Sequence, residues 1–542
     1  MKADDDFGPD RGMEFQTDDE ENRAETVEDS EDDYESEYTF SERNPSEYSN
    51  PSYHQMPWPQ SYRQSMDMLT SVTPPTVGFL AGTSISGLGS SFLSPSAYKR
   101  THASDYNASL AQPFFSEVDQ LSFPEPTATP KRSSYTSYQR SSFHELPPPA
   151  QQCSCAQSVL NGVNVLCGVG LLSTPFAVKE GGWMSLLILF GFSIISCYTG
   201  LLLKRCLESS PGLKTYPDIG QAAFGVPGRL FIAIILYIEL YACCVEFITL
   251  MGDNMSTLFP NARMDIGGIH LNCHTFFTIL MTIFLLPTIL LRNLSLLSYL
   301  SGGGVVASLL VVLCLLWVGV VDQVGFHPSG TTLNLANIPV SLGIYGFCYA
   351  GHSVFPNLYS SMKKPSEFST VLVISFSICC FLYTGVAICG FMMFGDSMQS
   401  QFTLNMPQNF VASKIALWTA VVNPLSKYAL TLTPVALSLE ELMPPSPLRS
   451  HYVSVFIRTV LVTSTLVVAL SVPFFGFVMA LIGSLLTMLI ALIFPCACYL
   501  SILRRRLNWL QIGVCIFIII VGIVSSCIGT YSATKKIVDN LG

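Results

Sequence analysis

The chain has 542 residues, of which 49% are hydrophobic and only 12% are charged. Soluble domains carry roughly 25% charged residues, so this composition excludes a soluble globular protein and indicates an integral membrane protein. The formal net charge of −10 is unevenly distributed, because residues 1–50 carry −15 and the rest of the chain carries +5.

Residues 1–150 are rich in Ser, Pro, Tyr, Asp and Glu and have no sustained apolar periodicity. Such a segment buries too little apolar surface to offset its chain entropy, so we predict a disordered cytosolic tail of unknown partners. Its acidic start lacks the basic and apolar regions of a signal peptide. The acidic run at 26–33 fits either a phosphorylation or sorting segment or a merely solvated tail.

The membrane region, which we place at residues 151–542, begins with a poorly formed helix. Gly168, Gly170 and Pro175 weaken an α-helix, and Asn161 and Asn164 are polar groups on one face of it. In hydrocarbon, a weakened helix is tolerated where it lines a cavity or is buried in protein. The glycines therefore indicate either a break that binds a ligand or close packing against another helix.

Eleven apolar runs are long enough to span a bilayer. They lie at residues 157–178, 183–203, 229–252, 273–291, 296–321, 336–359, 369–394, 412–434, 452–472, 475–500 and 509–531. Most basic residues fall in the even-numbered connections, which are cytosolic if the polar tail is cytosolic. These residues are Lys204, Arg205, Lys214, Arg292, Lys363, Lys364, Arg449, Arg504, Arg505 and Arg506. An odd number of spans is consistent with this bias.

The third run contains two carboxylates, Glu239 and Glu246, seven residues apart on one helix face. Carboxylates at membrane depth are costly and usually face a cavity, a partner or a proton path. We keep both as candidates for proton coupling. The alternative is a structural carboxylate that is hydrogen-bonded to a neighbouring helix or lies close to the interface.

Other polar groups of the membrane region have simpler predicted roles. His270 and His274 are expected to be exposed loop residues, because no partner is evident nearby. Lys427 either neutralises a carboxylate on another helix or extends toward the interface, and the second role is favoured. Most of the 17 cysteines lie in apolar runs without metal-ligand spacing, so no metal site is predicted.

The sixth run repeats the irregularity of the first. Gly346, Gly351 and Pro356 weaken it, and His352 adds a polar side chain. It lies five runs after the first weakened helix. Two inverted five-helix repeats would give this offset, with the substrate held between their broken first helices.

Five segments together resemble the amino acid/auxin permease family, in its eukaryotic vacuolar amino-acid transporter branch. They are residues 161–183, 245–254, 291–300, 351–365 and 423–428. The acidic tail also looks like that of the plant members. The resemblance covers roughly residues 150–540, consistent with one transport domain.

The resemblance implies an all-α membrane protein of eleven transmembrane helices, with LeuT-type inverted repeats and broken first and sixth helices. It also implies secondary active transport of amino acids, of which we expect neutral ones, across the vacuolar membrane. The proton is the implied coupling ion, with no other cofactor. A sensor that binds amino acids and signals through its tail is the alternative. The sequence shows no nucleophile–base pair, metal motif or nucleotide-binding loop, so we expect neither an enzyme nor a nucleic-acid partner.

Under this reading, the substrate lies between the two weakened helices. Its carboxylate would bind N–H groups freed at the first break, and its amine would bind carbonyls near Asn164 and the sixth run. Its side chain would face aromatic residues of the third and sixth runs. The predicted substrate-binding residues are Asn161, Asn164, Gly168, Val169, Gly170, Tyr345, Tyr349 and His352.

Overall fold

The computed structural model describes residues 58–63, 66, 153–262, 264–266, 269–290, 303–327, 329–443 and 451–542. The chain divides into residues 1–55 and residues 56–542. The predicted disordered tail, residues 1–150, lies outside the described residues except for 58–63 and 66. These seven residues belong to the second unit.

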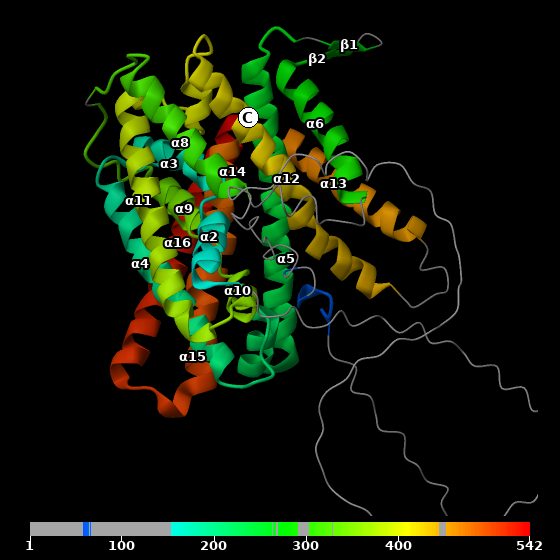
Figure 1. The fold of residues 1–542 in the computed structure, drawn as a ribbon, viewed down its shortest axis with the longest axis vertical. Coiled ribbons are helices and arrows are strands. Elements are labelled where there is room, and N and C mark those ends of the chain that lie inside the picture. Colours follow the sequence, from blue (N-terminus) through cyan, green and yellow to red (C-terminus); the bar gives the residue numbers. More distant parts are fainter. Residues whose placement is uncertain are drawn as a thin grey trace, which may run out of the picture. The chain divides into compact units, whose positions relative to one another are not determined.

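The second unit is helical in its described part, apart from one small hairpin (Figure 1). The α-helices are α2 (Cys155–Leu166), α3 (Gly170–Gly181), α4 (Ser185–Glu208), α5 (Tyr216–Leu258), α6 (Cys273–Leu290), α8 (Gly304–Val320), α9 (Ile338–Cys348), α10 (Phe355–Ser361), α11 (Phe368–Phe394), α12 (Val411–Leu442), α13 (His451–Ser471), α14 (Phe475–Ile482), α15 (Phe494–Leu503) and α16 (Trp509–Leu541). Short 3-10 segments are η2 (Pro365–Glu367), η3 (Gly395–Ser397), η4 (Phe402–Asn405) and η6 (Arg504–Arg506), and η5 (Gly483–Ile493) is a π-helix. Strands β1 (Met264–Ile266) and β2 (Ile269–Leu271) pair antiparallel.

The helix lengths identify an all-α membrane protein. Among the described residues, seven helical segments are long and apolar enough to cross a membrane, and the bent pair α2 and α3 makes an eighth. Helices α8, α9 and α12 coincide with three further predicted runs. The total of eleven spans stays a prediction, because these three do not meet the same criteria of length and composition.

Local sequence explains where the spans begin. The Ser154 hydroxyl accepts a hydrogen bond from the N–H of Gln157 and starts α2, and Thr215 caps α5 through Asp218 in the same way. Within α5, Gly225 has a φ of 72°, a conformation that favours glycine, and it kinks the chain there. The kink separates the first turns of α5 from the apolar run predicted to begin at residue 229.

Helix α9 and the π-helix η5 pack with their backbones almost in contact. A Cβ placed on Gly483 would lie 1.9 Å from the carbonyl oxygen of Gly343, and one on Gly343 would lie 2.2 Å from that of Ala480. Backbone atoms on both sides leave no flexible side chain that could move away. Gly343 and Gly483 therefore allow close packing of the two helix backbones at this contact.

Gly483→Val is expected to destabilise the protein by at least about 3 kcal/mol, because overpacking here must separate two backbones. Thermal melting of detergent-purified protein measures the effect. Gly513→Val is the matched control on α16, since a Cβ there has no atom within 4 Å. A Gly483→Val variant that melts with the wild type would contradict this packing.

Candidate functional site

The predicted break in the first span is present between α2 and α3, which meet at a 50° bend. Cys167, which follows α2, has a non-helical ψ of 67°. Pro175 lies inside α3 and has no N–H to donate to the carbonyl of Leu171. The Thr174 hydroxyl donates to that carbonyl instead, at 3.1 Å. Helix α3 therefore continues past its proline, while the break itself falls at residues 167–169.

The break leaves two N–H groups available at the start of α3. In the described part of the chain, neither the Val169 N–H nor the Gly170 N–H donates to a backbone or side-chain acceptor. The positive end of the helix dipole lies at the same place. Backbone N–H groups at a helix N-terminus are suited to binding a carboxylate.

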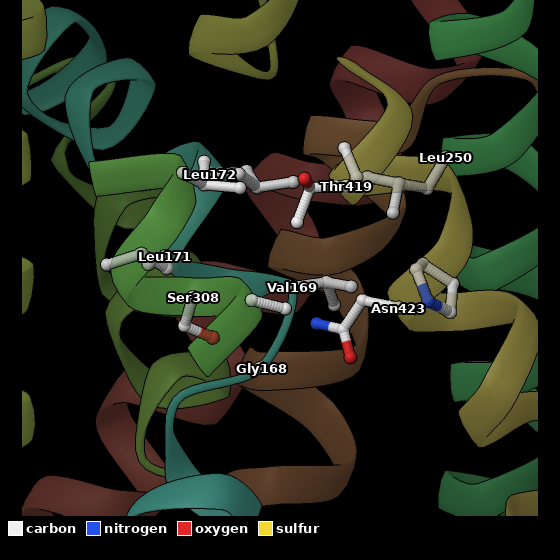
Figure 2. A pocket seen from close by; sticks show the side chains of 12 residues that line it. Gly168, Val169, Leu171, Leu172, Leu250, Ser308, Thr419 and Asn423 are labelled. Atoms are coloured by element: carbon white, nitrogen blue, oxygen red, sulfur yellow. The ribbon is translucent and has the colours of Figure 1, made fainter. Parts of the chain in front are cut away.

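A small pocket of about 20 Å³ lies beside these N–H groups (Figure 2), and a wider hollow of about 280 Å³ shares Ala307, Thr419 and Asn423 with it. Its walls come from the break, α5, α8 and α12, and its lining is Gly168, Val169, Leu171, Leu172, Leu250, Ala307, Ser308, Val311, Thr419, Ala420, Asn423 and Pro424. In Figure 2, Asn423 of α12 points toward Val169. The Asn423 Oδ1 is buried and has no hydrogen-bond partner among the described residues. This oxygen could accept a hydrogen bond from a ligand amine.

The two glycines of the break have different surroundings. A Cβ on Gly168 would meet no atom within 4 Å, whereas one on Gly170 would lie 3.0 Å from Cys348 Sγ and 3.2 Å from Cys348 Cα. Gly168 lines the pocket, and Gly170 lets α3 approach the end of α9. A side chain at position 170 would therefore point at α9, whereas the Gly170 N–H lies at the break.

Protein donors already occupy the carbonyls that we expected to bind the substrate amine. The Tyr383 hydroxyl of α11 is hydrogen-bonded to the carbonyl of Leu166 and, at 2.9 Å, to that of Cys348. Lys427 Nζ donates to the Asn164 carbonyl at 3.3 Å. Lys427 therefore binds a backbone oxygen at the end of α2, and this contact corrects both roles expected for it. A substrate amine is better served by Asn423.

Tyr383→Phe is expected to lower the free energy of unfolding by about 2 kcal/mol, because it leaves the buried Cys348 carbonyl without this donor and the Leu166 carbonyl with only the Gly168 N–H. It should also loosen the joint between α2 and α9. Melting temperature and uptake rate report the two effects. Tyr531→Phe on the exposed face of α16 is the control. Unchanged melting of Tyr383→Phe would show that the bridge contributes nothing.

The sixth run is also interrupted, since α9 ends at Cys348 and α10 begins at Phe355. His352 lies in this gap, is 1% exposed, and its Nε2 is 2.9 Å from the Thr199 hydroxyl of α4. The Tyr345 hydroxyl is hydrogen-bonded to Ser185, also of α4.

The remaining predicted residues also lie away from the pocket lining. The Tyr349 ring stacks on Phe376 and contacts Tyr383. Asn161 is buried in α2, and its amide nitrogen has no partner among the described residues. Of the eight predicted substrate-binding residues, the pocket lining thus contains Gly168 and Val169, with Gly170 beside them.

The two membrane carboxylates have different surroundings. Glu239 accepts a hydrogen bond from the Thr487 hydroxyl of η5 at 3.2 Å, as a structural carboxylate would. Glu246 is 1% exposed, and neither of its oxygens has a hydrogen-bond partner among the described residues. It lies one turn before Leu250, on the face of α5 that lines the pocket.

A polar cluster at the end of α5 continues this face and was not predicted. Asp253, seven residues after Glu246, has Oδ1 3.2 Å from His274 Nε2 and accepts a hydrogen bond from the Gln401 amide at 3.0 Å. Gln401 is also bonded to Asn254. His274 therefore does have a partner and is half-buried, contrary to the expectation of an exposed loop residue. Its partner, Asp253, is close in space but is not a neighbour in the sequence.

Comparison with known proteins gives a consistent match. The family described as "Transmembrane amino acid transporter protein" matches residues 151–535. The Arabidopsis thaliana protein "Amino acid transporter AVT1C" is 54% identical over 503 residues, covering 91% of each chain. "Amino acid transporter AVT1D" of the same organism is 56% identical, covering 92% of this chain and 90% of its own. A solved Na+-coupled sialic acid symporter is 14% identical with a TM-score of 0.43, covering 70% of this chain and 89% of its own.

Proposed function

The chain belongs to the transmembrane amino acid transporter protein family, and from this we propose that it carries amino acids, neutral ones in particular, across the vacuolar membrane in exchange for or together with protons. Its relatives are transporters, so it is a transporter and not an enzyme. The vacuolar location and the proton coupling rest on the sequence resemblance. The cytosolic N-terminus rests on the distribution of basic residues.

The observation that carries the proposal is the pocket at the break between α2 and α3. Two unused N–H groups, those of Val169 and Gly170, would bind a ligand carboxylate, and Asn423, whose oxygen has no partner among the described residues, lines the same pocket. An amino-acid zwitterion has a carboxylate for the two N–H groups and an ammonium group for the Asn423 oxygen. The apolar residues of the lining, such as Leu172 and Leu250, would receive an aliphatic side chain.

We propose the LeuT-type inverted-repeat arrangement of eleven spans for this chain. Its support is that the interruptions at 167–169 and 349–354 lie in the first and sixth predicted runs, five runs apart. Tyr383 joins the two interrupted helices at their ends. Alternating access would then proceed by rocking of the helices that carry the breaks against α5, α8 and α12.

Glu246 is the carboxylate that we assign to proton coupling. Its oxygens have no partner in the described structure, whereas Glu239 is bonded to Thr487. An unpartnered carboxyl group in this setting is most stable when protonated, because an isolated buried carboxylate is strongly disfavoured. Asp253 lies farther along the same helix and, with His274 of α6, provides a polar connection toward its end.

Uptake of labelled neutral amino acids into vesicles containing the purified protein tests the proposal. Saturable uptake that collapses when the imposed pH gradient is removed is the expected result. Uptake that does not depend on the gradient would show that transport is not coupled to protons. Binding without uptake under any gradient would favour an amino-acid sensor.

A further inference from the structure

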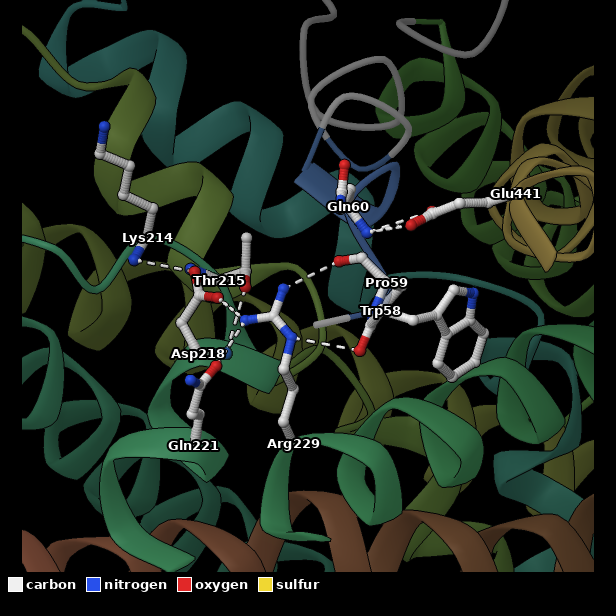
Figure 3. Close-up of polar contacts among 9 residues, drawn as sticks. All are labelled: Trp58, Pro59, Gln60, Lys214, Thr215, Asp218, Gln221, Arg229 and Glu441. Carbon is white, nitrogen blue, oxygen red and sulfur yellow. Dashed lines mark hydrogen bonds and ion pairs between the residues drawn. The ribbon is translucent and has the colours of Figure 1, made fainter. Parts of the chain in front are cut away.

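A short piece of the N-terminal tail packs against the helical unit. It contacts residues that lie 170 or more positions away in the sequence. Residues 58–63 and 66, here called the tail segment, contact α5 and α12 (Figure 3). They also contact the gap between α9 and α10. Tyr62 is 1% exposed and Met66 is 0% exposed. Burial of this extent in a polar, acidic tail indicates a specific binding site and not a passing contact.

Arg229 of α5 is the first anchor of the tail segment. It is 7% exposed and donates to the carbonyls of Trp58 at 3.2 Å and Pro59 at 2.9 Å. Its remaining donors bind the Asp218 carboxylate and the Gln221 amide oxygen. The guanidinium group has five N–H donors in a fixed fork, so a buried arginine needs several acceptors. Here the tail backbone supplies two of them.

Glu441, near the end of α12, is the second anchor. Its carboxylate accepts hydrogen bonds from the N–H of Gln60 at 2.8 Å and from the N–H and hydroxyl of Ser61 at 3.0 and 2.8 Å. One turn earlier, the Ser438 carbonyl accepts from Trp58 Nε1 at 3.1 Å. The tail segment thus links α5 to α12 through groups of opposite charge on its two sides.

Tyr62 extends the contact to an interrupted helix. Its hydroxyl donates to the carbonyl of Ser353 at 3.2 Å, and its ring lies edge-on to Tyr237 of α5, with 5.9 Å between ring centroids. Trp58 contacts the same Tyr237 ring at 5.5 Å. Ser353 follows His352 in the gap between α9 and α10. One peptide therefore contacts α5 and α12 as well as the gap of the interrupted helix, and alternating access would move this gap relative to α5 and α12.

We propose that the mouth formed by α5, α12 and the gap before α10 is a peptide-binding site, and that the tail segment occupies it as a built-in inhibitor. This inference rests on the proposed transport function. A peptide that binds only one arrangement of these helices shifts the population toward that arrangement. Because the peptide is tethered to its site, its effective concentration is high. Even a modest affinity is then enough to keep the site occupied.

The site also suggests how the tail segment is released. Ser61 donates its hydroxyl to Glu441, so a negative charge at this position faces a carboxylate. Ser61→Asp should therefore expel the segment by like-charge repulsion, and Ser61→Ala should only weaken it. Trp58→Ala combined with Tyr62→Ala removes both aromatic contacts with Tyr237 and leaves the helices themselves unchanged.

The test uses the full chain and a fluorescent synthetic peptide of residues 56–68. The Trp58→Ala/Tyr62→Ala protein should bind the peptide at least about tenfold more tightly than the wild type, whose own tail competes for the site. A peptide carrying Tyr62→Ala should bind neither protein. Absence of binding to the double variant, or equal binding of both peptides, would overturn the proposal whether or not the protein transports.

Uptake gives the second readout. In vesicles, the double variant and Ser61→Asp should take up amino acid severalfold faster than the wild type, and added peptide should return the double variant to the wild-type rate. Equal rates in all proteins, with the wild type active, would overturn the inhibitory role alone. A wild type and variants that are all inactive would instead contradict the proposed transport function.

Discussion

Gly168→Leu is expected to abolish amino-acid uptake while the protein stays folded. The side chain would project into free space, since no atom lies within 4 Å of a Cβ at this position. It would occupy the pocket beside the N–H groups of Val169 and Gly170. Loss of two hydrogen bonds to a charged group, each worth about 1.5–3 kcal/mol, weakens substrate binding by at least about 100-fold. Saturation binding of labelled amino acid measures this directly.

The control for this variant is Gly385→Leu in α11, where a Cβ also has no atom within 4 Å. That variant should bind and transport as the wild type does, and both variants should melt at the wild-type temperature. Gly170→Val is less informative, because its side chain would press on Cys348 and alter the contact with α9. Wild-type uptake by Gly168→Leu would place the substrate elsewhere.

Glu246→Gln is expected to uncouple uptake from the pH gradient. Glutamine keeps the shape of the side chain and cannot release a proton. A gradient of about two pH units stores about 2.7 kcal/mol per proton and supports up to about 100-fold accumulation when one proton is coupled to each substrate. The variant should equilibrate substrate without accumulating it. The measurement is accumulation in vesicles over a series of imposed gradients.

Glu239→Gln provides the comparison, since its oxygen is bonded to Thr487 and its expected role is structural. It should keep accumulation that depends on the gradient, with some loss of stability. If Glu246→Gln accumulates substrate like the wild type while Glu239→Gln does not, the proton is carried by Glu239 and the assignment reverses.

The interruptions of the first and sixth spans could be predicted because glycine and proline act on the local backbone. Gly168 weakens a helix whatever surrounds it, and the structure has its break there, whereas α3 continues past Pro175. The membrane carboxylates could be found in the same way, since an isolated Glu246 in an apolar run stands out. These features need no knowledge of the tertiary contacts.

The composition of the pocket could not be predicted, because it depends on contacts between distant residues. Tyr383 lies 217 positions after Leu166, whose carbonyl it contacts, and it is one aromatic residue among many in an apolar run. Asn423 did belong to a conspicuous Asn-Pro pair, but only its position opposite Val169 relates it to the break.

The tail segment escaped prediction for a related reason. Trp58 and Tyr62 lie in a polar region with no periodic apolar pattern, so composition assigns them to a disordered tail. Their binding depends on Arg229 and Glu441, which are supplied by the helical unit. A few aromatic residues in a short helical turn can dock on a preformed surface without a sustained apolar pattern in the sequence.

The central claim is that the break between α2 and α3 binds the carboxylate of an amino acid. Competition binding to the purified protein tests it most directly, with a labelled neutral amino acid displaced by the unlabelled amino acid, its carboxamide and the corresponding decarboxylated amine. The amino acid should compete at least about 100-fold more strongly than either analogue, because only it offers a charged acceptor to the Val169 and Gly170 N–H groups. Equal competition by the decarboxylated amine would contradict the claim.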